Sequence, residues 1–151
     1  MEDSQIHLTL RFIGEVSKDG ADQIMKALKQ VKGRPFSLRM KSVGFFPPRK
    51  EPRILWAGIA ENEELLRLQN RIERAVVSAG IDNDERKFHP HVTLARLHAT
   101  PSRHVARFVT GNSLFMTEEF SISSFHLYES TSGKEGAIHA KVADYRLEGN
   151  D

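Results

Sequence analysis

The sequence contains no cysteine, and none of its apolar runs approaches the ~20 residues that a membrane-spanning helix needs. The first absence excludes disulfides and cysteine-based zinc or nucleophile chemistry. No signal-peptide pattern opens the chain, so we expect a cytoplasmic protein without a membrane partner. An excess of one sign of charge is also lacking, because the chain has 22 Lys and Arg and 20 Asp and Glu. The resulting net charge of +2 permits a polyanionic ligand without indicating one.

What is present describes an ordinary globular chain. Of 151 residues, 39% are hydrophobic and 28% are charged, a balance typical of folded domains rather than disordered segments. This length is enough to bury a core in one domain, or in one domain with two similar lobes.

One short motif occurs twice. The pattern His-x-Thr-Leu begins at His7 and again at His91. Successive side chains of an extended strand point to opposite faces, so His7 and Thr9 share one face, as do His91 and Thr93. Each copy predicts a half-buried strand, the first over Gln5–Ile13. If the two strands face each other, two imidazoles and two hydroxyls converge at a cleft.

Such a quartet suits a phosphodiester. Hydrolysis needs one group that takes a proton from water and another that protonates the leaving oxygen, and imidazoles can do both near neutral pH. Threonine hydroxyls can donate hydrogen bonds to the non-bridging phosphate oxygens, where negative charge accumulates in the transition state.

Three segments carry apolar residues at helical spacing. The first runs from Ser17 or Asp19 to Gly33, and the second runs from Asn62 to Gly80. The third begins at Thr100-Pro101 and ends at Gly111, with three side chains expected to point inward: Val105, Phe108 and Val109.

Strand patterns lie between these helices. Alternation from Phe36 shifts its parity between Met40 and Val43, which predicts a bent or bulged strand. The nearly continuous apolar run over residues 53–59 predicts a strand buried on both faces. A second strand with a parity shift is expected over residues 120–128, and a last one over residues 137–147.

The order of these elements repeats. The two His and the two Thr are each 84 residues apart, and Met40, Val43 and Phe45 recur 82 residues later as apolar positions. We therefore expect a duplication with repeats at roughly 5–60 and 89–147, linked by the helix over about 62–80. The whole chain, 1–151, would be a single bilobal domain whose lobes pack about a pseudo-twofold axis.

Together the two His-x-Thr-Leu motifs, the Val-Gly-Phe-Phe-Pro segment from Val43 and the run from His89 to Arg96 resemble the two-histidine phosphoesterase superfamily. Within it the chain is similar to the RNA 2′,3′-cyclic phosphodiesterase branch, once called 2′-5′ RNA ligases. The resemblance covers essentially the whole chain. It implies an α+β fold with two antiparallel sheets, flanking helices and two His-x-Thr-Leu strands that face a central cleft.

The resemblance also implies the reaction. Such an enzyme hydrolyses 2′,3′-cyclic phosphate ends of RNA, or small cyclic nucleotides, to 2′-phosphates without metal or cofactor. His7 would be the general acid and His91 the general base, while Thr9 and Thr93 hold the phosphate. Arg96 is a phosphate contact in similar proteins.

Strict alternation places Arg96 on the face opposite His91, so this role requires a bend or a long reach. The same alternation places Arg11 on the face of His7 and Thr9, so it favours Arg11 as the phosphate contact.

Other side chains allow alternatives. His89 and His98 could form a metal cluster with His91. Pro90 lies between His89 and His91, however, and no acidic ligand is near, so we expect no metal. Phe46 and Trp56 could stack a base, although strand aromatics more commonly belong to the core.

Similar proteins usually begin with a further strand and helix before the first His motif, and this chain starts near that motif. We expect a monomer, with a dimer completed by a partner chain as the alternative. Two alternative functions stay open: a non-catalytic RNA- or nucleotide-binding protein, and a 2′-5′ RNA ligase that runs the reverse reaction.

Overall fold

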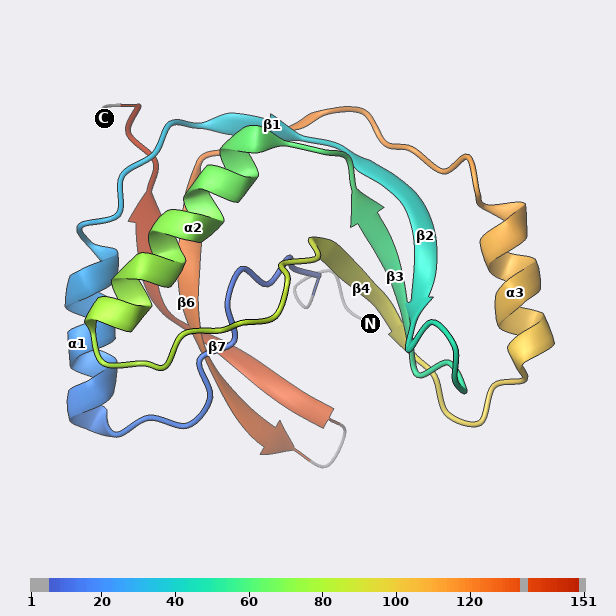
Figure 1. Ribbon diagram of the computed structural model, residues 1–151, viewed down its shortest axis with the longest axis horizontal. Helices are drawn as coiled ribbons and strands as arrows, with labels where there is room; N and C mark the ends of the chain where they lie inside the picture. The colour runs from blue at the N-terminus through green and yellow to red at the C-terminus, as the bar shows by residue number, and fades with distance from the viewer. Residues whose placement is uncertain (1–5, 134–135, 150–151) are drawn as a thin grey trace. The chain divides into compact units, whose positions relative to one another are not determined.

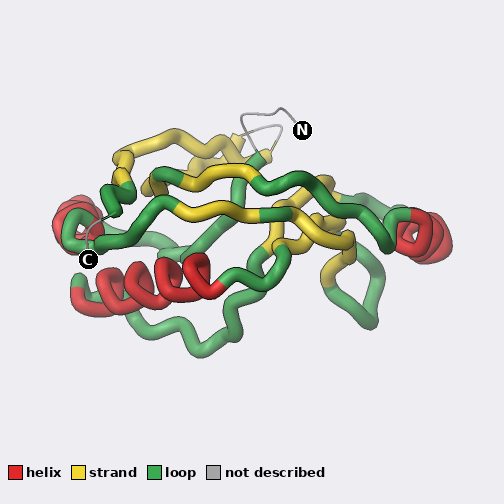
Figure 2. The backbone as a smooth tube through the Cα atoms, turned by 90° about the horizontal axis from the view of Figure 1, so that it is seen from above, coloured by secondary structure: helices red, strands yellow, loops and turns green. Residues whose placement is uncertain are grey.

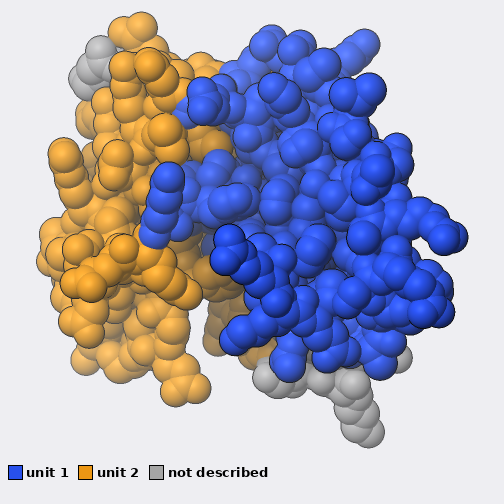
Figure 3. All heavy atoms as spheres, turned by 45° about the vertical axis from the view of Figure 1, so that its right-hand side comes forward, with its two compact units in different colours: residues 1–10, 37–62, 87–120 blue, residues 11–36, 63–86, 121–151 orange. Residues whose placement is uncertain are grey.

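The chain divides into two compact units in a computed structural model that describes residues 6–133 and 136–149 (Figures 1 and 3). Unit 1 takes the chain up to Leu10, then Ser37–Asn62 and Lys87–Phe120, and unit 2 takes the three remaining segments. Each unit therefore draws on both predicted repeats, so the units do not coincide with the repeats. The fold is α+β with antiparallel sheets.

Unit 1 is built on a three-stranded antiparallel sheet, in which β3 (Ile54–Ile59) lies between β2 (Met40–Phe46) and β4 (His91–Arg96) (Figure 1). The sheet confirms that these segments are strands. The expected burial of β3 on both faces is met only at Ala57 and Gly58, and its other four residues are half-buried.

The predicted parity shift in β2 is a β-bulge. Met40 pairs with Ile59 and Val43 pairs with Ala57, so β2 carries one extra residue between these pairs. Ser42 within the bulge has a φ of 62°. The bulge turns the following side chains, which lets the rest of β2 keep its apolar face on the core.

Helix α3 (Ser102–Gly111) packs beside β2 and buries Val105. Pro101, rather than Thr100, occupies the N-cap position and makes no side-chain cap bond. The prediction that Phe108 points inward is wrong, because 43% of it is exposed. With one fully buried side chain, this helix covers only a narrow strip of the sheet.

Unit 2 contains two helices that lie side by side and a β-hairpin (Figures 1 and 2). The helices are α1 (Lys18–Leu28) and α2 (Glu63–Ser78), and the hairpin pairs β6 (Ser124–Gly133) with β7 (Gly136–Arg146). The side chain of Ser17 accepts a hydrogen bond from the Gly20 amide, which caps α1 where the sequence predicts its start.

The core of unit 2 comes from Ile24 and Leu28 of α1, one stripe of α2 and one face of the hairpin. The predicted stripe on α2 is buried, namely Leu65, Leu68, Ile72 and Val76. Phe125 stacks on Tyr145 with ring centroids 4.9 Å apart, and the Tyr145 hydroxyl donates to the Met25 carbonyl of α1. Gly80 follows α2 with a φ of +103°, as its predicted role as a helix stop requires.

Helix α1 ends at Leu28 instead of continuing to Gly33. The two short strands β1 (Phe36–Leu38) and β5 (Phe120–Ile122) contain the points where the chain passes from one unit to the other. Within the described residues, no helix combines the length and the apolar composition needed to cross a membrane.

The predicted strand over Gln5–Ile13 is wrong in extent. Gln5 lies outside the described residues, and from residue 6 on the segment makes a single antiparallel bridge, between Leu8 and Val92. The chain bends at Leu10, and the next side chain, Arg11, is held in an ion pair with Glu73.

Candidate active site

A single bridge brings the two His-x-Thr motifs together. Leu8 pairs antiparallel with Val92, and in such a pair the flanking residues oppose each other, His7 beside Thr93 and Thr9 beside His91. These four side chains point away from the face that carries Leu8 and Val92. All of them belong to unit 1. The structure thus gathers the four residues that the repeated motif singled out.

The ring of His91 is held by the backbone beside it. Its Nδ1 lies 2.6 Å from the carbonyl oxygen of His89. A carbonyl can only accept, so Nδ1 carries the proton and the neutral ring has its lone pair on Nε2. His91 is therefore prepared to take a proton through Nε2, which is what a general base must do.

The neighbouring strand supplies the floor of the site. Trp56 of β3 pairs with Thr93, and Gly58 pairs with His91, so both lie on the same face as the motif residues. The indole covers Gly44 of β2 so closely that a Cβ there would lie 2.3 Å from Cζ2 of Trp56. Only glycine allows this approach, and a glycine inside a strand is the signal that could have indicated it.

Aromatic rings surround His91. The Phe46 and His91 centroids are 5.1 Å apart with an interplanar angle of 78°, and Phe46 lies 5.4 Å from Trp56. His89 completes the group, 5.2 Å from Trp56. Phe46 and Trp56 are half-buried on the site face, so the choice between a core role and a stacking role stays open for both rings.

A second β-bulge decides the position of Arg96. Leu55 pairs with Ala95 but Trp56 pairs with Thr93, so β4 has one extra residue, Leu94. Arg96 consequently opposes Ile54, which shares the face of Trp56 and Thr93. The parity objection to Arg96 assumed uninterrupted alternation, and the bulge removes it.

Arg96 is exposed and lines a cavity of about 450 Å³ together with Arg53 and His98. The lining of this cavity also includes one carboxylate, that of Glu51.

The alternative cation, Arg11, has a structural role in unit 2. Its Nε lies 2.5 Å from Oε2 of Glu73, and it also donates to the Asp82 carbonyl. Its side chain is only 7% exposed. The hydrogen bond from Arg11 is the main reason why the pKa of Glu73 lies below its ordinary value. Arg11 is therefore committed to an ion pair and does not join the motif residues.

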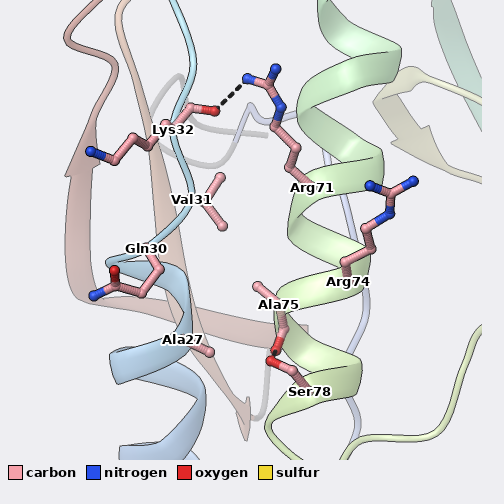
Figure 4. A pocket seen from close by; sticks show the side chains of 8 residues that line it. All are labelled: Ala27, Gln30, Val31, Lys32, Arg71, Arg74, Ala75 and Ser78. Atoms are coloured by element: carbon pink, nitrogen blue, oxygen red, sulfur yellow. Dashed lines mark hydrogen bonds between the residues drawn. The ribbon is translucent and has the colours of Figure 1, made fainter. Parts of the chain in front are cut away.

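No cluster of three or more potential metal ligands occurs within the described part of the chain. His89, His91 and His98 are thus not gathered as a metal site. A cavity of about 520 Å³ between α1 and α2 has a floor of small and apolar side chains such as Ala27 and Ala75, and Arg71 donates to the Lys32 carbonyl at its rim (Figure 4). Its lining has no histidine or carboxylate, so it offers no acid–base pair.

Comparison with known proteins gives consistent results. The family model described as the 2'-5' RNA ligase superfamily matches residues 1–134. A protein of Aeropyrum pernix named RNA 2',3'-cyclic phosphodiesterase is 40% identical over 98 residues, a match that covers 64% of this chain and 56% of that protein. A protein of Aquifex aeolicus with the same name is 28% identical over 153 residues, covering 99% of this chain and 81% of its own length.

Solved structures share the fold. TT0787 of Thermus thermophilus superposes with a TM-score of 0.81 at 25% identity, covering 97% of this chain and 80% of that one. E. coli LigT complexed with 3'-AMP superposes with a TM-score of 0.74 at 21% identity, covering 95% and 78% of the two chains.

Proposed function

The chain belongs to the 2'-5' RNA ligase superfamily, and on that basis we propose that it is an RNA 2′,3′-cyclic phosphodiesterase. It hydrolyses a 2′,3′-cyclic phosphate end of RNA to a 2′-phosphate and a free 3′-hydroxyl. The observation that carries this proposal is the Leu8–Val92 bridge, which sets two His-x-Thr motifs on one face. Relatives named for this activity, in Aeropyrum pernix and Aquifex aeolicus among others, support it.

In this proposal His91 is the general base. Its Nδ1–H is engaged by the His89 carbonyl, so Nε2 takes a proton from water as the water oxygen attacks phosphorus. The bond between phosphorus and the 3′ oxygen breaks, and protonated His7 delivers its proton to that oxygen. Both histidines end in the opposite protonation state and exchange protons with solvent before the next turnover.

The remaining motif residues stabilise charge. Thr9 and Thr93 donate hydrogen bonds to the non-bridging oxygens of the phosphate as negative charge grows on them. Arg96, on the same face because of the bulge at Leu94, contributes a positive charge to the phosphate. These roles require no metal or cofactor. The expectation of a cytoplasmic monomer is part of the same proposal.

Ligation is the reverse of this reaction, by attack of an RNA hydroxyl in place of water. The same site could perform it, but water is in vast excess, so hydrolysis dominates. A non-catalytic binding protein is the other alternative, and dependence of turnover on both histidines distinguishes the enzyme from it.

The test is incubation of the chain with a short RNA ending in a 2′,3′-cyclic phosphate, in the presence of a chelator, with identification of the product end. We expect a 2′-phosphate from the wild type and none above background from His91→Ala. His104→Ala is the matched control, since His104 is an exposed histidine of α3 in the same unit. Turnover that requires added metal, or that survives in His91→Ala, would overturn the proposal.

A further inference from the structure

The β6–β7 hairpin has two chemically different faces. Its register pairs Phe125 with Tyr145, and these stacked rings are buried in unit 2. Alternation therefore places the residues between them on the other face. From β6 this face receives Ser124, His126, Tyr128 and Ser130, and from β7 it receives Arg146, Asp144, Lys141 and His139.

Every residue of this set can form hydrogen bonds. The register shift between Leu127 and Tyr128 adds an extra residue to β7, Val142, and so keeps Lys141 opposite Tyr128 on the polar side. We call this surface the polar face of the hairpin.

The polar face has a net positive character. Asp144 is its one carboxylate, and its Oδ1 lies 2.5 Å from Nδ1 of His126 and 3.2 Å from Nζ of Lys141. The hydrogen bond from His126, then that from Lys141, holds the pKa of Asp144 below its ordinary value. The Asp144 carboxylate thus orients the side chains of His126 and Lys141. Arg146, at the end of β7, is exposed.

An aromatic ring stands among these charges. Tyr128 is 44% exposed, although it lies in the middle of a strand. The His126 ring packs against it in an edge-to-face arrangement, with centroids 6.1 Å apart and an interplanar angle of 77°. The contact with the His126 ring limits the rotamers of Tyr128. Less conformational entropy is then lost when a flat ligand stacks on the Tyr128 ring.

We propose that the polar face binds single-stranded RNA, with a base stacked on Tyr128 and with Arg146 in contact with a backbone phosphate. Aromatic side chains on an exposed sheet, flanked by cations, are suited to splayed bases and to the sugar–phosphate backbone. The cations of this face outnumber its one carboxylate, which favours a polyanion such as RNA as the partner. The inference rests on the proposed function, which makes RNA the polyanion that the chain must hold.

The experiment measures binding without turnover. A fluorescein-labelled single-stranded RNA of 12 nucleotides with a 3′-hydroxyl end is titrated with the full chain and followed by anisotropy at several salt concentrations. Tyr128→Ala should weaken binding about 5- to 100-fold, whereas Tyr128→Phe, which keeps the ring, should stay within about twofold of the wild type. Arg146→Gln should reduce the slope of log Kd against log salt concentration by about 0.7.

Two control variants isolate the polar face. Ile138→Ala removes a side chain that is 57% exposed on the other face of the same hairpin, and Arg67→Gln removes a cation that Glu63 and Glu64 already neutralise. Both should bind the RNA like the wild type. Thermal melts of all variants verify that they are folded.

Unchanged binding by Tyr128→Ala, equal weakening by Ile138→Ala, or a wild-type chain that does not bind the 12-mer would each overturn the inference. Tyr128-dependent binding together with no hydrolysis of cyclic ends would instead contradict the proposed function alone. The two failures are therefore distinguishable.

Discussion

Among the residues of the candidate site, His91 has a ring whose tautomer and orientation are fixed by its neighbours. Its tautomer is set by one hydrogen bond to the adjacent His89 carbonyl, so the main chain before β4 prepares Nε2 as a base. The Phe46 ring at 5.1 Å restricts the orientation of the imidazole from the other side. The tautomer and the orientation of the imidazole thus come from local groups.

We predict that His7→Ala and His91→Ala each lower kcat by about 10²–10⁴-fold, the usual contribution of a positioned acid or base. Thr9→Ala and Thr93→Ala should cost less, because each removes one hydrogen bond to the phosphate. Steady-state kinetics on a cyclic-ended RNA checks this. A wild-type rate profile against pH should be bell-shaped, since one imidazole must be neutral and the other charged. A kcat for His7→Ala within threefold of the wild type would contradict the assigned role.

The Arg11–Glu73 pair should make stability depend on pH at the acid end. The pKa of Glu73 in the folded chain lies below its ordinary value of 4.5, so the pair stabilises fully above pH 4.5 and this contribution is lost as the pH falls below it. Glu73→Gln should therefore be less stable at pH 7 by about 1–3 kcal/mol, since it leaves a mostly buried guanidinium without its counter-charge.

Urea unfolding at pH 7 and pH 3 measures this difference, which should shrink at pH 3. Glu64→Gln, at an exposed pair on the same helix, is the control and should change stability by less than about 0.5 kcal/mol at either pH. An equal deficit of Glu73→Gln at both pH values would argue against the linkage.

At the scale of elements, two bulges shape the site. The one in β2 was visible in the sequence as a shift of apolar parity between Met40 and Val43. The one at Leu94 of β4 was not, because His91–Arg96 reads as regular alternation followed by a cation. It moves Arg96 to the face of His91 and Thr93. The bulge depends on how β4 pairs with β3, which the sequence of β4 alone does not show.

We predict that Gly44→Ala damages both stability and activity. The new Cβ would lie 2.3 Å from the Trp56 ring, so the indole must move, at a cost of about 1–3 kcal/mol for an overpacked position. Because Trp56 and Phe46 pack around His91, the displaced indole should also lower kcat by about tenfold or more. Thermal melts and cyclic phosphodiester hydrolysis test the two effects.

Gly111→Ala is the matched control for this variant, since a Cβ added there, at the end of α3, would have nothing within 4 Å. It should be neutral or slightly stabilising. If Gly44→Ala melts and turns over like Gly111→Ala, the close approach of Trp56 is not required.

At the scale of the whole molecule, the chain passes repeatedly between two compact units. Each unit is assembled from three segments that are distant in sequence, so neither can be completed by a continuous stretch of chain. This interleaving differs from the predicted repeats, 5–60 and 89–147, each of which contributes to both units. The duplication and the single bilobal domain over 1–151 stay predictions.

We predict that the two units unfold in one cooperative step. Trp56, the single tryptophan, reports on unit 1 by fluorescence, whereas the far-ultraviolet circular dichroism is dominated by α1 and α2 of unit 2. Thermal transitions followed by the two signals should coincide, as two-state unfolding requires. Midpoints that differ by more than a few degrees would show that the units unfold separately.

The sequence by itself determined the start of α1, the extent of α2 and the choice of candidate site residues. Apolar spacing and cap residues sufficed for α1 and α2, because a helix is stabilised by contacts between residues three and four apart in the chain. The repeated motif sufficed to select His7, Thr9, His91 and Thr93, since residue type and parity are local properties. Such features need no knowledge of what packs against them.

Only the tertiary structure decided on which face Arg96 lies and how Arg11 and His91 are held. Parity favoured Arg11 over Arg96, whereas the structure holds Arg11 in an ion pair with Glu73, 62 residues away, and places Arg96 on the face of Thr93 through a bulge in β4. These outcomes depend on contacts between distant segments, which no pattern along one segment encodes.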